Sequence, residues 1–172
     1  MPRNPVIVGR GLAGLGLLAG TSYRPRQRII TLHGRVVNYR VLWKRGGRFA
    51  SNCIRFGPET YLDPAGTPGR YLNHACEPNA GIRKVGNRLV VFAARAIPAG
   101  VEILIDYSTT IGDDDIWTMR CRCGSHACRR TVRRFGTLPP ALQLQYLRDG
   151  LVPGFIVRTL LEKPDLLEAS ER

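Results

Sequence analysis

The hydrophobic positions of this chain fall into short runs that are separated by glycine, proline and polar residues. Short apolar runs between turn signals are typical of strands. The two clearest predicted strands cover residues 88–94 and 102–107, with a turn at 97–100 between them. Residues 57–69 are rich in proline and glycine and are expected to form a loop. Shorter strands are predicted at residues 6–8, 28–32, 36–37, 41–43 and 52–56. Many short strands separated by glycine and proline turns predict a mostly β fold.

The apolar spacing changes to a helical period toward the C-terminus. A proline pair precedes an apolar pattern over residues 141–148, and proline is tolerated in the first turn of a helix. Asp149-Gly150 ends this predicted helix, because glycine favours the left-handed conformation at a helix C-terminus. A second helix is predicted over residues 152–162. Residues 135–172 are therefore expected to form a helical extension behind the β-rich body.

Charge is distributed unevenly along the chain. The 26 basic residues exceed the 13 acidic residues, the formal net charge is +13, and all but three of the basic residues are arginines. The first acid is Glu59, so the N-terminal third carries nearly the whole excess. Such a field favours an anionic partner, either nucleic acid or an acidic protein face, and a solvated basic surface is the alternative. No apolar stretch is long enough for a membrane span, so no membrane partner is expected.

The glycine-rich run near the N-terminus has competing interpretations. Gly9-x-Gly11-x-x-Gly14 follows a short apolar stretch and matches the fingerprint of a dinucleotide-binding loop. That loop requires an acid about 20 residues later to bind a ribose, and none occurs in that stretch. Pro25 would also cut short the crossover helix. The remaining interpretations are a glycine-rich bend at a barrel corner, or backbone brought close to a ligand.

Cysteine usage indicates a metal site. Three of the five cysteines lie within residues 121–128. The odd count, without a signal-peptide pattern, argues against a secreted disulfide framework. We expect a cytoplasmic protein, with association to the nucleoid or the nucleus as an alternative. Free buried thiols or a disulfide are the alternatives to a metal site.

Three blocks of sequence carry a family resemblance. Residues 70–79 read RYLNHACEPN, residues 95–107 read RAIPAGVEILIDY and residues 121–128 read CRCGSHAC. In order and spacing they resemble the SET-domain protein lysine methyltransferases with their cysteine-rich post-SET tail. The resemblance covers about residues 5–132.

The resemblance implies a compact β fold of small curved sheets. In that fold the segment 73–79 is threaded by the C-terminal segment into a pseudoknot. We expect the chain to divide into a SET domain (residues 1–118), a zinc-bound post-SET tail (119–134) and the helical extension (135–172). The extension lies outside the resemblance, and the alternatives for its helices are packing on the core, a dimer surface or a wall of the substrate site.

The activity that the resemblance implies is methyl transfer from S-adenosylmethionine to a lysine amine of a protein substrate. The amine would enter an apolar channel at Tyr107, the catalytic candidate, which matches the tyrosine of the family's D-Y pair. A core tyrosine at a strand end is the alternative for Tyr107. Tyr71 and Ile105 are the channel candidates. Burial beside the sulfonium cation would lower the pKa of the lysine from its usual value near 10.4.

The implied cofactor-binding residues come from two regions. One is the glycine run, which looks like the family's G-x-G-L-F-A, and the other surrounds the N-H pair. The candidates are Gly14, Leu15, Gly16, Tyr61, Arg70, Asn73 and His74. A lone histidine is more often a satisfied core residue, so this candidate depends on the motif around it.

The implied metal site uses four thiolates. Cys121, Cys123 and Cys128 supply three, and a closed structural zinc site requires four ligands. The resemblance assigns the fourth to Cys76, so a single zinc site with four cysteine ligands would join the tail to the core. Cys53 is left over and is interpreted as a core residue.

Some positions depart from the family pattern. Residues 31–34 stand where the family has E-Y-x-G, so a second channel tyrosine is missing. Arg130 replaces a usual glycine. Residues 113–115 are consecutive aspartates, interpreted either as a solvated loop or as a local attraction for a basic peptide. The rival hypothesis is a SET-like scaffold that binds protein or nucleic acid through its arginine-rich faces without turnover.

Overall fold

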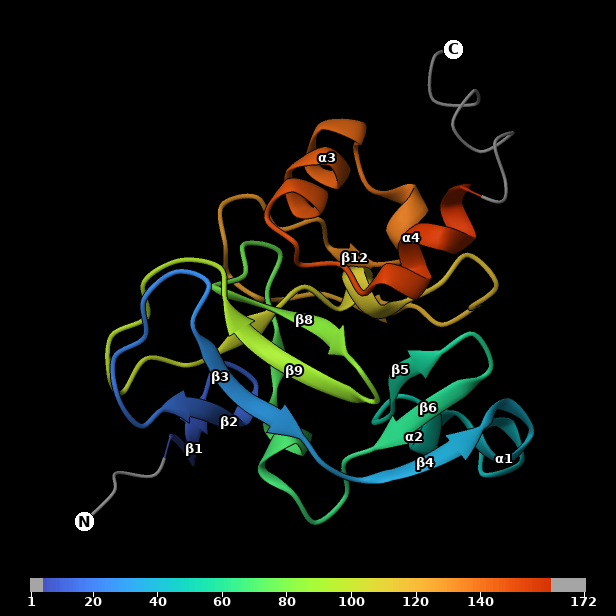
Figure 1. Ribbon diagram of the computed structural model, residues 1–172, viewed down its shortest axis with the longest axis horizontal. Coiled ribbons are helices and arrows are strands. Elements are labelled where there is room, and N and C mark those ends of the chain that lie inside the picture. Colours follow the sequence, from blue (N-terminus) through green and yellow to red (C-terminus); the bar gives the residue numbers. More distant parts are fainter. Residues whose placement is uncertain (1–4, 162–172) are drawn as a thin grey trace.

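The computed structural model describes residues 5–161, with side chains described for residues 5–158. The strands are β1 (Val6–Gly11), β2 (Gly14–Ala19), β3 (Arg28–Leu32), β4 (Arg35–Asn38), β5 (Ile54–Gly57), β6 (Thr60–Asp63), β7 (Asn73–His74), β8 (Ala80–Val85), β9 (Arg88–Ala93), β10 (Leu104–Ile105), β11 (Met119–Arg120) and β12 (Thr131–Val132). The helices are α1 (Tyr39–Lys44), α2 (Gly47–Ala50), α3 (Pro140–Arg148) and α4 (Gly154–Leu161). Small sheets, most of them antiparallel, confirm the mostly β prediction (Figure 1).

The glycine-rich run forms an antiparallel hairpin of β1 and β2. Gly14 has φ +104, a conformation that side chains rarely adopt, so glycine is required at the turn. The backbone of Tyr23 then pairs with Ile97, and the chain enters β3 without a crossover helix. This arrangement excludes the dinucleotide-binding interpretation and leaves the bend or a ligand contact.

The principal core is built on the sheet β3-β9-β8. Its fully buried side chains include Leu17, Ile82, Leu89, Val91 and Ile103. Burial of each such side chain contributes about 1.5–3 kcal/mol, so this cluster is the main source of stability. The strands predicted at residues 28–32 and 88–94 are confirmed as β3 and β9. The pattern missed β8, although the pair Gly86-Asn87 is a hairpin signal and Gly86 has φ +56.

The second three-stranded sheet, β4-β6-β5, corrects two predictions. Residues 41–43 were expected as a strand but belong to α1, because the Asn38 side chain accepts a hydrogen bond from the backbone N–H of Val41 and caps the helix. The expected loop 57–69 contains β6, which is paired on both sides. Tertiary pairing here outweighs the local turn signals.

The segments expected in the pseudoknot lie side by side. β7 pairs in parallel with β10, and the backbone N–H of Asn79 donates to the carbonyl of Leu104. The strand predicted over residues 102–107 is shorter than expected. Asp106 ends it by accepting a hydrogen bond from the backbone N–H of Ser108, which caps a 3-10 turn over Tyr107–Thr110.

The C-terminal extension packs onto the body of the protein (Figure 1). The helices predicted at residues 141–148 and 152–162 correspond to α3 and α4, and the residues after 161 lie outside the described part. Arg83 of β8 donates to the carbonyl of Gly150, and Gly81 contacts Leu151. Within residues 5–161 no helix has the length and apolar character to cross a bilayer.

One buried carboxylate joins the body, the tail and the extension. The Asp106 side chain is inaccessible to solvent and lies 2.6 Å from Arg129 Nη2, in the tail. The Tyr146 hydroxyl of α3 donates to the same carboxylate over 2.9 Å and lies 3.3 Å from the carbonyl of Cys76. Because a buried charge is costly unless it is paired and hydrogen-bonded, these partners stabilise one another.

Replacing Asp106 by alanine is expected to destabilise the fold by about 3–5 kcal/mol, because Arg129 would keep a largely buried, uncompensated charge. Tyr146→Phe removes one hydrogen bond and is expected to cost about 1 kcal/mol. Urea denaturation followed by circular dichroism measures both. The control is Asp149→Ala at an exposed site, expected within about 0.5 kcal/mol of wild type. A control loss as large as the Asp106→Ala loss would contradict this account.

Candidate functional site

A cavity of about 100 Å³ opens between α1, α2 and the 3-10 turn that carries Tyr107. Four of the sequence-predicted site residues line it: Tyr61, Arg70, Ile105 and Tyr107. Apolar and aromatic walls come from Leu42, Trp43, Leu72, Ile111 and Trp117. Tyr71, the other channel candidate, is half-buried and is not among the lining residues. The cavity is therefore small, and its wall combines these apolar and aromatic side chains with polar ones, among them Ser51, Arg70 and Asp115.

Tyr107 is held by both its hydroxyl and its backbone. The hydroxyl donates to the carbonyl of Leu72 over 2.8 Å, and the backbone N–H donates to His74 Nδ1 over 3.1 Å. Burial, with a smaller contribution from Glu102, raises the pKa of Tyr107 to about 12. The phenol is therefore neutral near pH 7, and its oxygen keeps acceptor capacity toward a neighbouring donor.

Two tryptophans line the cavity besides Tyr61 and Tyr107. The ring of Trp117 lies 6.3 Å from the ring of Tyr107, and its Nε1 donates to Ser51 Oγ over 2.9 Å. Trp43 of α1 lines the same cavity. Sequence reasoning missed both, because Trp117 belongs to an irregular segment and Trp43 to a misassigned strand.

The aspartates at 113–115 are not a solvated loop. Arg55, which is buried, lies 2.6 Å from Asp114 Oδ1 and 2.8 Å from Asp115 Oδ2. The Tyr61 hydroxyl donates to Asp115 Oδ1 over 2.7 Å, and burial together with this bond raises the pKa of Tyr61. Tyr61, a cofactor candidate from the sequence, therefore lines the cavity. The positive charge of Arg55 offsets the negative charges of Asp114 and Asp115 beside it.

His74 is neutral and bound on both ring nitrogens. Burial is the main cause that lowers the pKa of His74 to about 4. Nδ1 accepts from the Tyr107 backbone and Nε2 lies 3.5 Å from Cys76 Sγ. Nδ1 also lies 3.5 Å from Asp106, but a neutral ring makes no ion pair there. The histidine thus sits between the Tyr107 backbone and a cysteine cluster.

Glu102 organises the glycine hairpin and was not a candidate in the sequence. Its carboxylate accepts from the backbone N–H of Leu12 and from Asn73 Nδ2, each over 2.7 Å. Asn73 Nδ2 also donates to the carbonyl of Leu15 over 3.0 Å. A Cβ at Gly16 would lie 2.2 Å from the carboxylate, so a larger residue there would displace the Glu102 side chain from this position. Glu102 and Asn73 together fix the predicted cofactor segment against β7.

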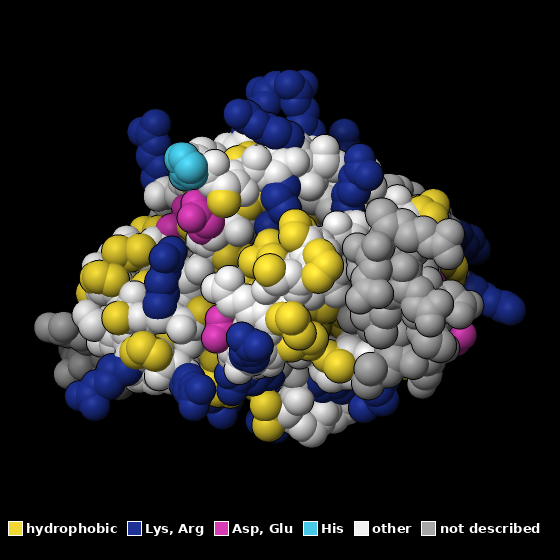
Figure 2. Space-filling model, turned by 90° about the horizontal axis from the view of Figure 1, so that it is seen from above, with side chains coloured by type: hydrophobic (Ala, Val, Ile, Leu, Met, Phe, Trp, Pro, Cys, Tyr) yellow, Lys and Arg dark blue, Asp and Glu magenta, His cyan; other side chains and the backbone are white. Residues whose placement is uncertain are grey.

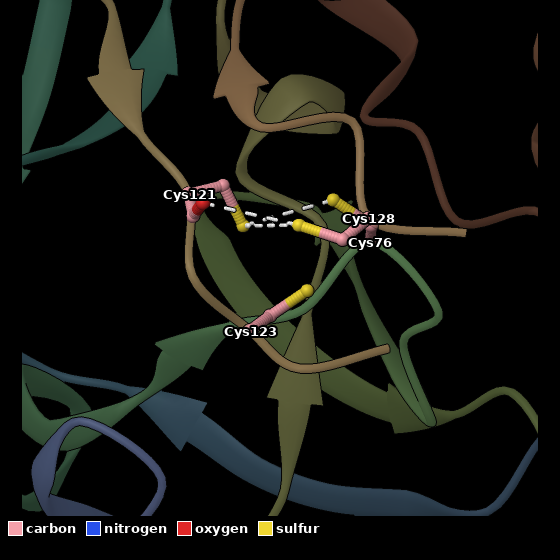
Figure 3. A group of neighbouring side chains, drawn as sticks. All are labelled: Cys76, Cys121, Cys123 and Cys128. Atoms are coloured by element: carbon pink, nitrogen blue, oxygen red, sulfur yellow. Dashed lines mark hydrogen bonds between the residues drawn. The ribbon is translucent and has the colours of Figure 1, made fainter. Parts of the chain in front are cut away.

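Four of the five cysteines converge on one point (Figure 3). The sulfur atoms of Cys76, Cys121, Cys123 and Cys128 all lie within 4.8 Å of one another. Cys121 Sγ lies 3.8 Å from Cys76 Sγ and 3.7 Å from Cys128 Sγ. Because the sulfur atoms of a disulfide are about 2 Å apart, these distances exclude a disulfide in this arrangement.

The cysteine cluster fits a tetrahedral thiolate site. Sulfur ligands at about 2.3 Å from a tetrahedral centre lie about 3.8 Å from one another, as the closest pairs here do. Burial raises the pKa of Cys76, and a divalent cation at the centre would offset this cost of ionisation. The arrangement is therefore compatible with zinc.

Cys53 and Arg130, two further positions singled out in the sequence, are not part of the four-cysteine cluster. Cys53 packs with Leu42 and Tyr61, and burial is the main cause that raises its pKa to about 11, as expected of a core thiol. Arg130 has φ +64, the left-handed region that explains why glycine is usual there. A non-glycine residue in this conformation carries strain of about 1–2 kcal/mol.

The family follows from a comparison of this chain with known protein families. The model of the SET domain matches residues 14–108, which is more than half of the chain. The chain belongs to the SET-domain family. The match contains β2, the second strand of the glycine hairpin, and the blocks around Asn73 and Tyr107. The cysteines at 121–128 and the helical extension lie beyond it.

Relatives and solved structures agree with this assignment. The chain is 28% identical over 140 residues to "Histone-lysine N-methyltransferase 2D" of Homo sapiens, and 32% identical over 140 residues to "Histone-lysine N-methyltransferase, H3 lysine-4 specific" of Saccharomyces cerevisiae. Each match covers 74% of this chain but only 2% and 13% of those relatives. The structure of Arabidopsis thaliana SUVH6 in complex with SAM has the same fold, with TM-score 0.59 and 21% identity over 74% of this chain and 32% of that one.

Zinc removal is expected to unfold the tail of this SET-domain protein selectively. The purified protein should contain one zinc ion per chain by elemental analysis, and Cys128→Ser should lower this content because a thiolate ligand is lost. A chelator should lower the melting temperature of wild type. Cys53→Ser is the matched control and should retain the metal. Equal zinc contents in both variants would disprove the four-cysteine site.

Glu102→Ala is expected to weaken binding of S-adenosylmethionine, because the hairpin would lose the carboxylate that holds Leu12 and Asn73. A hydrogen bond to a charged group contributes about 1.5–3 kcal/mol. Loss of one such bond therefore predicts that the affinity for S-adenosylmethionine decreases about tenfold or more. Isothermal titration calorimetry gives the dissociation constant. Glu77→Ala, at an exposed acid, is the control. Unchanged affinity in Glu102→Ala would show that the hairpin does not depend on this contact.

Proposed function

We propose that this chain is a protein lysine N-methyltransferase that uses S-adenosylmethionine. The observation that supports it is a small cavity within a SET domain that Tyr107 lines, with its hydroxyl bonded to the carbonyl of Leu72. Relatives that are named histone-lysine N-methyltransferases support the activity, and a neighbour solved with SAM supports the cofactor. The chain covers a small part of those relatives, so the activity is argued from its own residues.

Binding of the cofactor would involve the hairpin and the N-H block. S-adenosylmethionine supplies an electrophilic methyl group on a sulfonium. Leu15 is 56% exposed on β2, and its backbone is fixed by Asn73, so this strand offers a rigid surface beside β7. The residues proposed to contact the cofactor are Gly14, Leu15, Gly16, Arg70, Asn73 and His74.

The substrate amine must lose its proton before it can react. Its usual pKa is near 10.4, and transfer from water into the cavity disfavours the ammonium form. Cations of the protein act in the same direction, since Arg70 lines the cavity. The proton would therefore leave to solvent before the amine is enclosed. The amine nitrogen then forms a bond to the methyl carbon while the bonding pair of the carbon–sulfur bond passes to sulfur.

Tyr107 would orient the amine and would not act as a base. Its hydroxyl hydrogen is already donated to Leu72, so its lone pairs can accept an N–H of the substrate. Alignment of the nitrogen with the methyl carbon is the main source of acceleration for such a displacement. Ile105 and Leu72 exclude water around it, and Trp117 closes the wall on the tail side.

The tail would contribute through a zinc ion and through Arg129, which pairs with the Asp106 carboxylate next to Tyr107. We propose that Cys76, Cys121, Cys123 and Cys128 hold a structural zinc ion, because four converging thiols leave no position for a substrate. Cysteines that are kept from forming disulfides favour a reducing compartment, and we propose the cytoplasm.

Dimerisation through the extension remains a prediction. Leu144 and Leu147 are exposed apolar side chains on α3 that such a contact would cover.

The test is transfer of a labelled methyl group to lysine by the zinc-loaded protein, with the rate followed against pH. The rate is expected to rise with pH as the substrate amine loses its proton, below pH 10.4. Tyr107→Phe should lower the rate by about 100-fold or more and leave the position of this rise unchanged, because the phenol stays neutral in this range. Loss of the pH dependence in Tyr107→Phe would instead identify the phenol as the base.

A catalytically inactive scaffold is the rival function. It predicts that the zinc-loaded protein transfers no methyl group to any lysine, even when it binds S-adenosylmethionine. Labelled lysine that disappears in Tyr107→Phe would exclude the scaffold. Cofactor binding without transfer to any tested protein would favour it.

A further inference from the structure

One wall of the Tyr107 cavity is built from elements that carry exposed basic residues. α1 and α2 form one wall of the cavity, and Arg70 lies on its lining. No acid occurs among residues 5–58. The exposed basic residues of these elements are Arg40, Lys44, Arg45 and Arg48.

Two of these cations act directly on the cavity wall. Cys53 lines the cavity. Burial raises the pKa of this thiol and Asp63 raises it further, whereas Arg45 and Arg70 both oppose these effects. The positive charges of Arg45 and Arg70 are therefore felt inside the cavity. Arg45 also lies 4.8 Å from the centre of the Phe49 ring, which holds it against α2.

The acids near the cavity are largely compensated. Asp114 and Asp115 are paired with Arg55, and Asp113 lies 3.7 Å from Arg134 Nε. Glu59, at the turn between β5 and β6, is exposed. Asp63 acts more strongly on the Cys53 thiol than either Arg45 or Arg70, so the excess of positive charge lies in the exposed side chains of α1 and α2 rather than inside the cavity.

The tail carries further positive charge. Trp117 lines the cavity, and Arg120 and Arg122 follow it in the sequence as exposed residues. Residues 116–134 contain no acid. On the side of the molecule that carries the C-terminal extension, Figure 2 also shows basic side chains projecting around the outline. We call Arg40, Lys44, Arg45, Arg48, Arg70, Arg120 and Arg122 the cationic rim.

We propose that the lysine methylated in this cavity lies in an acidic protein segment, whose carboxylates pair with the cationic rim. This inference rests on the proposed function. A basic peptide would meet like charge on α1 and α2, which contribute lining residues to the cavity, and on the tail, which follows the lining residue Trp117, whereas an acidic one would be attracted and oriented. The occupant is a protein rather than a nucleic acid, because the small cavity suits an aliphatic amine and nucleotides carry none.

Two peptide libraries test the proposal. Each peptide carries one central lysine; the flanking positions are rich in aspartate and glutamate in one library and in arginine in the other. Methyl transfer to both is measured with the zinc-loaded protein, and binding is measured by fluorescence anisotropy. The kcat/KM for the acidic library is expected to exceed that for the basic library about tenfold, and added salt should reduce the difference.

Reversing the charge of two residues of the cationic rim tests whether the preference for acidic peptides arises there. Arg45→Glu combined with Arg48→Glu is expected to lower kcat/KM for the acidic library about tenfold, mainly through KM. The matched control, Arg24→Glu with Arg26→Glu, changes net charge equally in a loop away from the cavity. It should stay within about twofold of wild type. Melting curves verify that both variants are folded.

The outcomes separate this inference from the proposed function. Preference for the basic library, equal losses in the two double variants, or no binding of acidic peptides would overturn the acidic-segment proposal. Acidic peptides that bind through Arg45 and Arg48 without methyl transfer would count against the methyltransferase and still support the acidic partner. An RNA oligonucleotide that displaces acidic peptides and binds more tightly at the same salt concentration would overturn it in favour of nucleic acid.

Discussion

The Asp106 carboxylate is the constraint on which the arrangement of this SET domain depends. It ends β10, caps the turn that begins at Tyr107, and pairs with Arg129 and Tyr146 from two later segments. A solvent-inaccessible carboxylate is stable only when its acceptor positions are filled, so these contacts must form together. The orientation of Tyr107 is thereby tied to segments that lie far from it in sequence.

The cysteine cluster and this carboxylate act on the same piece of chain. Arg129 follows Cys128 directly, its backbone N–H lies 3.4 Å from Cys76 Sγ, and its guanidinium reaches Asp106. His74 connects the two from the other side, through Cys76 and the Tyr107 backbone. A metal held by the thiols would therefore fix both the tail and the turn at the cavity, although it would contact no substrate.

Local sequence signals located the parts of the site that lie within short motifs. The spacing of Cys121, Cys123 and Cys128 indicated a metal site, and the family resemblance added Cys76, which the structure brings beside them. The resemblance also pointed to Tyr107, whose catalytic role stays a prediction. Trp117, Glu102 and the pairing of Arg55 with the aspartates were missed, because each depends on residues far apart in the chain. The prediction of a strand at residues 41–43 was wrong for a local reason. The helix cap at Asn38 outweighed the strand preference of the β-branched and aromatic residues that follow.

The cationic rim has a consequence for the chemistry of its own surface. Arginine and lysine supply the same charge, but only lysine presents an amine that a lysine methyltransferase could alkylate. Six of the seven rim residues are arginines, and Lys84 of β8 is tied to the carbonyl of Phe56. An enzyme that attracts its substrate with guanidinium groups keeps that attraction unmodified through every turnover, and it offers almost no competing acceptor beside its own entrance.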